Sequence, residues 1–561
     1  MKSPLHNNMR KLIPGLAIAL SAPVLLYAAS GKSHDNAVAR NLNTFNTIVR
    51  ELEANYVDSI PVERTFSAAI AAMLSEIDPY TEYYTAADRE GFKTMTTGEY
   101  AGIGSYIMQR DSAVIISGPY EGSPAALAGL RSGDRIIRID TTDVSRASHD
   151  KVSELLRGQA GTKVSVSVAR PHSGPDSILT FNIERRKLNL PSVPYYGITQ
   201  GDMGYIKLTS FMEKSPEEVK KALEEFKANP QVKGVILDLR SNGGGLLESA
   251  VEIVNFFVPK GTEVLRTKGR DNRDTKIYRT TKQPLLPDMP VAVLIDGASA
   301  SASEITAGAL QDLDRGVLLG SRSFGKGLVQ STRPLPYDGM LKVTTAKYYI
   351  PSGRLIQALD YSRRNPDGTV AATPDSLCHT FKTLHGREVR DGGGLKPDIE
   401  IDWGKPSRLV YNLVRDNWVF DYGTQYAATH PSIPSAAEFE ITDSIYADFK
   451  RSIDPSRLKY DKVCEDMLNN LEKAAELEGY MNDSTKAEFA VMRKLLTHNL
   501  DRDLDTHRKD ISGYLATDII GRYYFNRGEI IQMLKDDEAV EKAAQILRDP
   551  AELKKLGIVT K

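Results

Sequence analysis

The chain has 561 residues, with 72 Lys and Arg against 73 Asp and Glu and a formal net charge of −1. Hydrophobic residues make up 41% and charged residues 26%, as in an ordinary globular protein. The balanced charge argues against a nucleic-acid or polyanion binder, which normally carries a basic excess. At roughly 150 residues per domain, the length predicts three or four structural units.

The N-terminus has the layout of a secretory signal peptide over residues 1–30. Three basic residues, Lys2, Arg10 and Lys11, precede an apolar run over residues 12–29 that ends in small residues. We therefore expect export to the periplasm or to the extracytoplasmic face of the membrane. The alternative is an uncleaved anchor that keeps the chain next to the membrane, because a run of this length is near the lower limit for spanning a bilayer.

Cys378 and Cys464 are the only cysteines of the chain. Export permits a disulfide between them, but a buried and unpaired pair fits the sequence at least as well. Neither cysteine lies in a CxxC or Cys/His spacing that would bind zinc. We expect no metal and no other cofactor.

Residues 31–97 predict a helical region. Apolar residues recur there at three- and four-residue steps, namely Leu42, Phe45, Ile48, Val49 and Leu52, then Phe66, Ile70, Met73 and Leu74. This amphipathic pattern is typical of a packing or dimerisation element.

Residues 98–188 change to short runs typical of strands, with two short helical stretches between them. The runs predict strands at 103–107, 113–116, 135–139, 163–168 and 177–181, and helices at 125–128 and 150–156.

This module resembles a PDZ domain. The run Ser123-Pro-Ala-Ala-Leu-Ala-Gly-Leu-Arg-Ser-Gly-Asp134 is typical of one, and Tyr100-Ala-Gly-Ile-Gly104 looks like its carboxylate-binding loop. Glycines let backbone N–H groups converge on an anion, and the next strand offers an open edge to an extended peptide. The resemblance implies capture of protein or peptide substrates by accessible C-terminal tails, with Gly102, Ile103 and Gly104 as carboxylate donors.

Residues 189–404 alternate buried strands with helices, which predicts an α/β layer structure. The predicted strands are 203–208, 234–239, 291–295 and 317–320, and the predicted helices are 216–228, 246–257 and 302–314. Turns of glycine and small residues at 241–245 and 296–301 each follow a strand directly. The carboxyl ends of strands are where the sites of α/β proteins are usually built.

Residues 405–561 again predict helices, including charged amphipathic stretches at 459–479, 485–499 and 536–547. We interpret this region as a scaffold, and as a candidate for contacts between copies of the chain in a homo-oligomer. Its sequence indicates no chemistry.

The lysine-containing segment of the α/β region first invites a different interpretation. Gly320-Ser-Arg-Ser-Phe-Gly-Lys-Gly327 satisfies most of the Walker A pattern, but Gly327 stands where Ser or Thr would bind Mg²⁺. We therefore exclude nucleotide binding at this segment. No histidine lies between His172 and His379, the interval that contains both turns.

A better interpretation joins Ser301 with Lys326. A serine hydroxyl needs a base to take its proton, and Ser–Lys pairs are a known variant of the catalytic triad. The lysine must be neutral to act; its ordinary pKa is about 10.4, and burial lowers a lysine pKa by roughly 3–5 units. Gly325 and Gly327 would let the backbone pack closely around it. The N–H groups of Ala302 and of a glycine at 243–245 are candidate donors to an oxyanion.

Three segments, residues 238–245, 299–312 and 323–330, resemble the carboxyl-terminal (tail-specific) processing proteases of the S41 serine peptidase family. Residues 349–354 and 393–398 match that family as well. The resemblance extends over residues 42–398 and does not convincingly cover the C-terminal helical region.

The resemblance assigns a role to individual residues. It implies Ser301 as nucleophile, Lys326 as general base, Gln330 to orient the lysine, and Gly245 and Ala302 as oxyanion donors. Gly244 remains an alternative donor. Asp312 matches an acidic position that is either supporting or structural.

The sequence therefore predicts an exported serine endopeptidase that cleaves proteins selected by their C-terminal tails. The expected fold is multidomain α/β plus α, with an S41 α/β core, an inserted PDZ β-sandwich or barrel-like domain, and helical N- and C-terminal regions. The alternative from another class is a catalytically silent, PDZ-containing binding or scaffold protein of the cell envelope. A Ser–His hydrolase that uses a distant histidine such as His379 is a further alternative.

Overall fold

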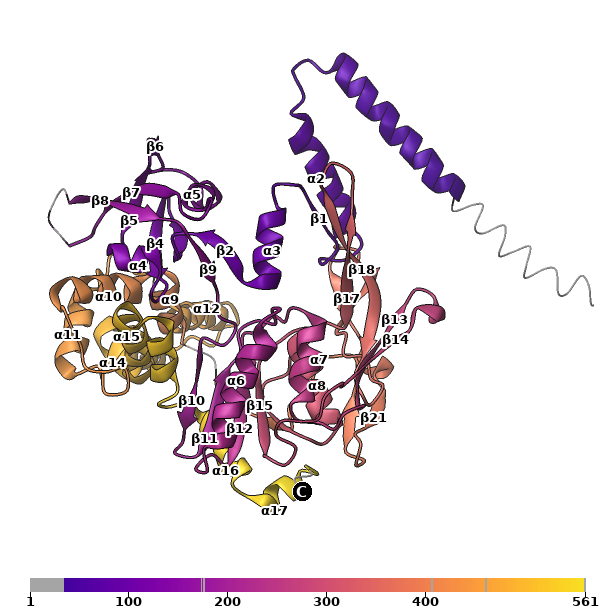
Figure 1. The fold of residues 1–561 in the computed structure, drawn as a ribbon. Coiled ribbons are helices and arrows are strands. Elements are labelled where there is room, and N and C mark those ends of the chain that lie inside the picture. Colours follow the sequence, from indigo (N-terminus) through magenta and orange to yellow (C-terminus); the bar gives the residue numbers. More distant parts are fainter. Residues whose placement is uncertain (1–34, 173, 175–176, 405–406, 460–461, 559–561) are drawn as a thin grey trace, which may run out of the picture. The chain divides into compact units, whose positions relative to one another are not determined.

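The computed structural model describes residues 35–172, 174, 177–404, 407–459 and 462–558 (Figure 1). The predicted signal peptide at 1–30 lies outside these residues. The chain divides into two compact units between Tyr83 and Tyr84. No helix among the described residues combines the length and the hydropathy that a membrane span requires.

The described part of the first unit, residues 35–83, is mostly helical, as its apolar pattern predicts. One helix covers residues 35–55, and α2 covers Val62–Ser75. The rings of Phe45 and Phe66 pack edge to face, with their centroids 6.1 Å apart. Much of the apolar pattern is nevertheless exposed, Leu42 at 64% and Met73 at 61%. A role in packing or dimerisation stays a prediction.

The PDZ-like module contains a sheet with strand order β3-β4-β5-β7-β8 and a separate β2–β9 pair. Its strands are β2 (Glu99–Gly102), β3 (Ser105–Arg110), β4 (Ala113–Pro119), β5 (Arg135–Ile139), β6 (Thr142–Asp143), β7 (Lys163–Ala169), β8 (Ile178–Glu184) and β9 (Arg186–Asn189). Its helices are α4 (Pro124–Ala128) and α5 (His149–Leu156), and α3 (Arg89–Thr97) precedes it. The short β1 (Glu82–Tyr84) spans the division between the two units.

Local sequence explains the ends of these elements. The Ser123 hydroxyl accepts a hydrogen bond from the Ala126 N–H at 3.1 Å and caps α4, and Gly129 ends that helix with a φ of 93°. The strand predicted at 103–107 is wrong at its start. Gly104 has a φ of 78°, so the chain turns there and β3 begins at Ser105.

The α/β core is built on a six-stranded sheet with strand order β10-β11-β12-β15-β16-β23. These strands are β10 (Tyr195–Thr199), β11 (Met203–Lys207), β12 (Gly234–Asp238), β15 (Val291–Ile295), β16 (Val317–Gly320) and β23 (Ile399–Glu400). Neighbours are parallel except for the antiparallel β10–β11 pair. The helices α6 (Ser215–Ala228), α7 (Leu247–Asn255) and α8 (Ala302–Asp312) alternate with them, close to the predicted positions.

Each face of this sheet is buried against a different set of helices. Val235 and Leu237 of β12 lie in one hydrophobic cluster with α6, α7 and α8. Ile236, between them, lies in a second cluster with α16 (Glu538–Leu547) from the C-terminal region. Because successive side chains of a strand point to opposite faces, α16 covers the face that the other three helices leave open.

A second, antiparallel sheet contains β13 (Glu263–Gly269), β14 (Lys276–Arg279), β17 (Leu328–Pro334) and β18 (Met340–Tyr349). β17 and β18 form a hairpin, and β13 pairs with both β14 and β18. Two small hairpins follow, β19 (Leu359–Arg364) with β20 (Val370–Ala372) and β21 (Thr380–Lys382) with β22 (Glu388–Arg390).

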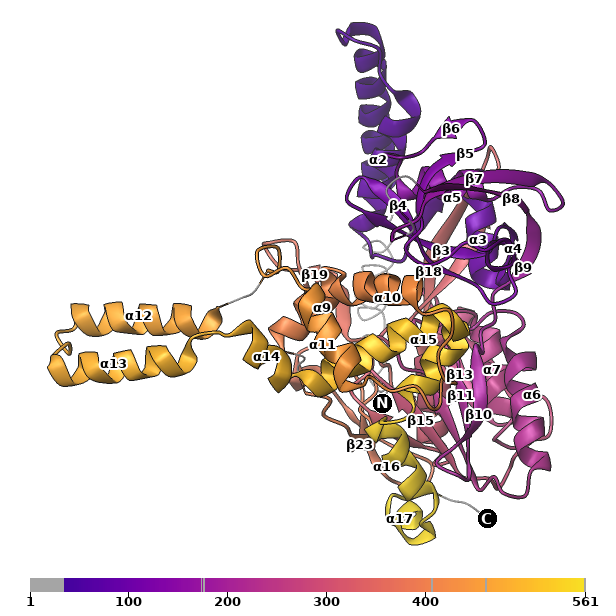
Figure 2. The same ribbon diagram turned by 90° about the vertical axis from the view of Figure 1, so that its left-hand side faces the viewer.

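The C-terminal region is helical, as predicted. Its helices are α9 (Arg408–Arg415), α10 (Trp418–Thr429), α11 (Asp443–Ser452), α12 (Val463–Leu477), α13 (Asp483–Leu496), α14 (Leu500–Thr506), α15 (Arg508–Met533), α16 and α17 (Pro550–Lys555). Most of them share one hydrophobic cluster. Figure 2 shows α12 and α13 side by side, extending away from the other helices.

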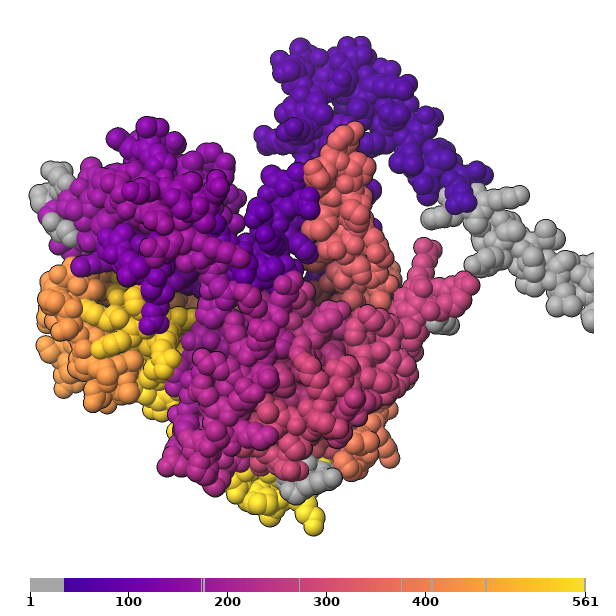
Figure 3. Space-filling model, viewed as in Figure 1, coloured from indigo at the N-terminus to yellow at the C-terminus, as the bar shows by residue number. Residues whose placement is uncertain are grey.

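The helical region also packs against the PDZ-like module. The Arg110 guanidinium forms two hydrogen bonds with the Asp421 carboxylate, one of them 2.6 Å long, and Arg522 donates to the carbonyl of Ser132 at 3.4 Å. In Figure 3 the C-terminal residues, in yellow, lie beneath this module and again at the lower edge of the magenta core. Cys378 and Cys464 are unpaired, but neither is fully buried, since Cys378 is half-buried and Cys464 is exposed.

Candidate active site

Three turns meet at the carboxyl edge of the parallel sheet. The 241–245 turn follows β12, Ser301 follows β15, and the segment with Lys326 follows β16. These strands are neighbours in the sheet. The fold therefore gathers the predicted nucleophile, base and oxyanion donors at one edge, as expected for an α/β site.

Ser301 has an unusual backbone conformation. It directly precedes the first residue of α8. Its φ is 56°, a positive value that residues other than glycine rarely adopt. Such a conformation costs about 1–3 kcal/mol and persists only where the surroundings enforce it. It places the serine at a sharp turn between a strand and the N-terminus of a buried helix.

Glu304 is the group that enforces this turn. Its carboxylate is fully buried and accepts four hydrogen bonds, from the N–H groups of Ser301 (2.9 Å), Gly325 (2.7 Å) and Lys326 (2.9 Å) and from the Ser323 hydroxyl (2.5 Å). Burial raises the pKa of this carboxyl, and the four donors counter that by favouring the ionised form. One side chain thus connects the backbone of Ser301 to the backbone of Lys326.

Tyr348 joins the same two segments from the other side. Its hydroxyl donates to the Lys326 carbonyl at 2.7 Å and lies 3.3 Å from the Ser301 carbonyl, and its side chain is 1% exposed. A methyl group on Gly325 would lie 2.4 Å from the Ala358 Cβ, and one on Gly327 would lie 2.9 Å from the Gln357 nitrogen. The glycines around Lys326 therefore allow the close packing that the sequence predicts.

The oxyanion candidates differ in their hydrogen bonding. The Gly244 N–H donates to Asn242 Oδ1 at 2.9 Å, so it is already engaged. Among the described residues, neither the Gly245 N–H nor the Ala302 N–H has an acceptor. A methyl group on Gly244 would lie 2.9 Å from both the Ala302 nitrogen and the Ser301 Cβ, which shows how closely this turn approaches the serine. This arrangement suits Gly245 and Ala302 as donors to an oxygen.

Gln330 lies on β17, opposite Thr344 of β18. Its Nε2 donates to the Thr344 hydroxyl at 3.1 Å, next to a bulge between Val329 and Gln330. Lys326 precedes the same strand. The predicted orientation of the lysine by Gln330 stays a prediction.

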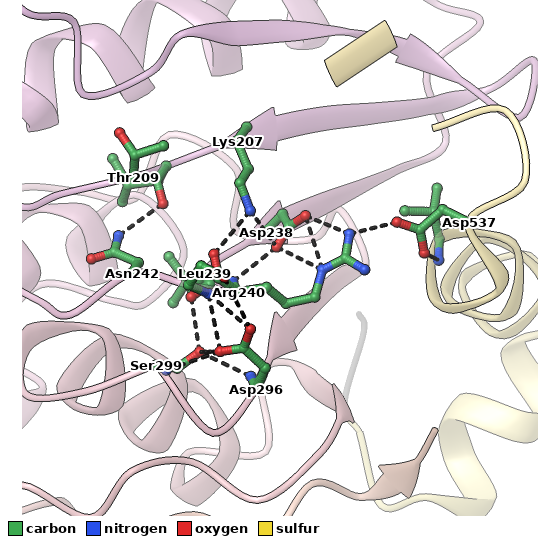
Figure 4. Close-up of polar contacts among 12 residues, drawn as sticks. Lys207, Thr209, Asp238, Leu239, Arg240, Asn242, Asp296, Ser299 and Asp537 are labelled. Carbon is green, nitrogen blue, oxygen red and sulfur yellow. Dashed lines mark hydrogen bonds and ion pairs between the residues drawn. The ribbon is translucent and has the colours of Figure 1, made fainter. Parts of the chain in front are cut away.

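A buried ionic network supports the turn with the oxyanion candidates (Figure 4). Asp238 accepts hydrogen bonds from the Arg240 side chain, including one of 2.6 Å, and an ion pair of 3.3 Å joins it to Lys207. Burial alone would raise the pKa of Asp238, but Arg240 and Lys207 lower it to about 2. Arg240 also pairs with Asp537, the residue before α16.

Two residues from the alternatives have other surroundings. Asp312 is buried and forms a 2.7 Å ion pair with the buried Arg354, as expected for a structural carboxylate. The side chain of His379 is 76% exposed and lies 3.4 Å from Asp391. Nothing in these contacts connects His379 to Ser301.

The carboxylate-binding loop predicted at 100–104 consists of the last three residues of β2 and the two residues that precede β3. Among the described residues, the N–H groups of Ile103 and Gly104 have no acceptor, whereas Gly102 lies opposite Arg186 in the β2–β9 pair. β3 is at the end of its sheet, so its outer edge has no strand partner in the part of the chain described. The Arg157 guanidinium lies 5.7 Å from the ring of Tyr100 and brings a positive charge to this loop.

Sequence reasoning did not assign roles to Glu304, Tyr348 and Arg157. The spacing of Glu304 three residues after Ser301 is a capping-box pattern that could have predicted its contact with the Ser301 N–H. Its contacts with Gly325 and Lys326 depend on the tertiary fold. The described residues contain no group of three or more His, Cys, Asp or Glu side chains arranged to hold a metal ion.

Three regions of the chain match known protein families. The profile of peptidase family S41 matches residues 202–367, a PDZ-domain profile matches 115–170, and the C-terminal helical domain of probable PDZ-proteases matches 409–547. A carboxy-terminal-processing protease of Bartonella bacilliformis is 35% identical over 405 residues, which cover 71% of this chain and 91% of that one.

More distant relatives have similar names. A probable CtpA-like serine protease of Staphylococcus aureus is 29% identical over 457 residues, which cover 80% of each chain. Among solved structures, a photosystem II D1 C-terminal processing protease aligns with 64% of this chain and 86% of its own, at 27% identity and a TM-score of 0.35.

Proposed function

Because the chain belongs to the carboxy-terminal-processing serine proteases of peptidase family S41, we propose that it cleaves peptide bonds with a Ser301–Lys326 dyad. The observation that carries this proposal is the double connection through Glu304 and Tyr348. These two buried side chains hold the backbone segments of Ser301 and Lys326 together. No comparable connection reaches a histidine among the described residues.

In the proposed reaction, neutral Lys326 takes the proton of the Ser301 hydroxyl as the oxygen attacks the substrate carbonyl. The N–H groups of Gly245 and Ala302 donate to the oxyanion. The lysine then gives its proton to the leaving amine, and an acyl group remains on Ser301. Water, deprotonated by the same lysine, hydrolyses the ester and restores both groups.

The PDZ domain would select the substrate by its C-terminal tail. The N–H groups of Ile103 and Gly104 are available to a terminal carboxylate, with Arg157 nearby and Gly102 as a further predicted donor. The tail would add as a strand to the open edge of β3. We further propose that the chain is exported and acts in the periplasm or at the extracytoplasmic face, as the basic and apolar pattern of residues 1–30 predicts.

The test uses an unstructured protein with an apolar C-terminal tail, and the same protein with that terminus amidated. Wild type should cleave the free-acid form and cleave the amide much more slowly. Ser301→Ala and Lys326→Ala should each lose roughly 10³-fold or more in kcat/KM. Lys233→Ala is the matched control. It removes an exposed lysine of the α/β region and should leave kcat/KM unchanged.

Two results would contradict the proposal. Cleavage by Lys326→Ala at the wild-type rate would favour a Ser–His hydrolase. Binding of the tail without cleavage by the wild type, across several tail sequences, would favour a catalytically silent scaffold protein.

A further inference from the structure

α16, a helix of the C-terminal region, brings a carboxylate to the carboxyl edge of the parallel sheet. α16 buries its apolar side against the sheet face opposite α8, with Val540, Ala544 and Leu547 among its buried residues. Asp537 is the N-cap of this helix. One carboxylate oxygen accepts hydrogen bonds from the Ala539 and Val540 N–H groups, at 3.0 and 3.1 Å. The other oxygen accepts from Arg240 Nη2 at 2.6 Å.

Arg240 is held on three sides. Its guanidinium contacts Asp238 and Asp537, its N–H donates to Asp238 Oδ1 at 2.9 Å, and its carbonyl accepts from Lys207 Nζ at 2.9 Å. The side chains of Asp238, Asp537 and Arg240 are 1%, 11% and 18% exposed, so water screens these charges only partly. Two carboxylates and two cations balance each other here.

Ser241, the residue after Arg240, begins the 241–245 turn, which we call the oxyanion turn. Asn242 of that turn is fully buried, and its carbonyl accepts from the Ala300 N–H at 3.1 Å and from the Ser303 hydroxyl at 2.8 Å. These contacts connect the turn directly to the residues on both sides of Ser301. The Asp537–Arg240 contact (Figure 4) is therefore linked to the Ser301 segment by the short backbone stretch from Arg240 to Asn242 and by the hydrogen bonds that Asn242 accepts.

We propose that Asp537 is a positioning residue for catalysis, through which the C-terminal helical domain fixes Arg240 and the 241–245 turn. Without the Asp537 carboxylate, the guanidinium keeps only Asp238 as an ionic partner and can rotate toward it. The N–H of Gly245 then loses its fixed direction relative to Ala302. This inference rests on the proposed Ser301–Lys326 chemistry, because that chemistry uses these donors.

The test replaces Asp537 with Asn, a residue that also caps helices well. Asp537→Asn keeps the cap of α16 and removes the charge that faces Arg240. We expect kcat to fall about 10- to 100-fold, less than or equal to the loss from removing an oxyanion donor, while KM for the tailed substrate changes less than twofold. The matched control is Asp549→Asn, since Asp549 caps α17 in the same way and the structure places no Arg240 contact on it. It should keep wild-type kcat.

Hydrogen–deuterium exchange separates positioning from general destabilisation. In full-length Asp537→Asn, amides of residues 241–245 should exchange faster, while those of 540–547 stay protected. Equal loss of protection in both segments, or a kcat within twofold of wild type, would overturn the inference. Failure of the proposed function is distinct, because wild type would then be inactive or Ser301→Ala would remain active.

Discussion

The two faces of the six-stranded sheet are covered by helices from different parts of the chain. On one face lie α6, α7 and α8, each of which follows a strand of the same sheet. On the other lies α16, which follows the whole helical domain. The first face holds Ser301 at the start of α8 and the second holds Asp537 at the start of α16.

This difference shows which parts of the chain form the α/β core. A helix formed between successive strands begins after Ser301, the proposed nucleophile, and contains the buried Glu304 that accepts a hydrogen bond from the Ser301 N–H. A helix that returns from the C-terminal domain covers the opposite face and contacts Arg240, which directly precedes the 241–245 turn. The helical domain is therefore part of the folded protease core as well as a neighbour of the PDZ domain.

The largest effect on kcat should come from removing hydrogen bonds to the carboxylate of Glu304, on the first face. Glu304→Gln places an amide donor among four hydrogen-bond donors, so at least one backbone N–H of Ser301, Gly325 or Lys326 loses its acceptor. We expect kcat to fall by about 100-fold or more, of the order seen when an oxyanion donor is lost.

The measurement is steady-state cleavage of the tailed substrate, beside Glu248→Gln as control. Glu248 is an exposed glutamate in the first turn of α7 and should tolerate the change. A Glu304→Gln enzyme with wild-type kcat would show that the connection between the two segments has no role in catalysis.

The next largest effect should come from shortening a buried side chain of α16, which should lower the stability of the core. Leu547 of α16 is 3% exposed and packs against the sheet, so Leu547→Ala should destabilise the core by about 2–5 kcal/mol. Leu477→Ala, at an 89% exposed position of α12, should change the free energy of unfolding by less than about 0.5 kcal/mol.

The measurement is urea unfolding, monitored by the loss of proteolytic activity. Its midpoint shows how much α16 stabilises the core. Equal midpoints for the Leu547 and Leu477 variants would mean that α16 is not part of the core.

The smallest effect concerns Glu529 of α15, the helix that precedes α16. Burial, together with the nearby Asp518 charge, raises the pKa of Glu529 from 4.5 to about 7, although Arg522 opposes this. A raised acid pKa means that the folded state holds the proton more tightly. Its stabilising contribution is therefore complete below about pH 4.5 and is lost as pH rises through 7.

Glu529→Gln should remove this pH dependence. Between pH 5 and 8 the stability of wild type should fall by on the order of 1–3 kcal/mol more than that of the variant. Denaturation midpoints at the two pH values measure the difference, and parallel curves for the two proteins would contradict the assignment.

The sequence was informative where local patterns decide the structure. The apolar runs at 234–239, 291–295 and 317–320 predicted β12, β15 and β16 because buried parallel strands are nearly continuous in apolar residues. The turns after these strands predicted that Ser301, Lys326 and Gly245 lie at one edge of the sheet. The antiparallel sheet of β13, β14, β17 and β18 was not predicted, because its strands are half-buried and mix charged with apolar residues.

Long-range partners escaped prediction for a physical reason. The amphipathic pattern at 536–547 predicted α16, but an apolar helix face does not indicate which distant surface it will cover. For the same reason the pattern gave no signal that Asp537 would meet Arg240. Gly104 shows a local failure: the run from Ile103 to Ile107 suggested one strand, but the chain turns at the glycine, which has a left-handed conformation.

The most direct test of the Ser301–Lys326 dyad restores the base chemically. Lys326→Cys should be inactive, and alkylation of the introduced thiol with 2-bromoethylamine should rebuild a side chain of lysine length and return a large part of the activity. The wild type, whose Cys378 and Cys464 are free, controls for alkylation elsewhere, and Ser301→Ala combined with Lys326→Cys should not respond. Full modification of the thiol, verified by mass spectrometry, without recovery of activity would contradict the assignment of Lys326 as the general base.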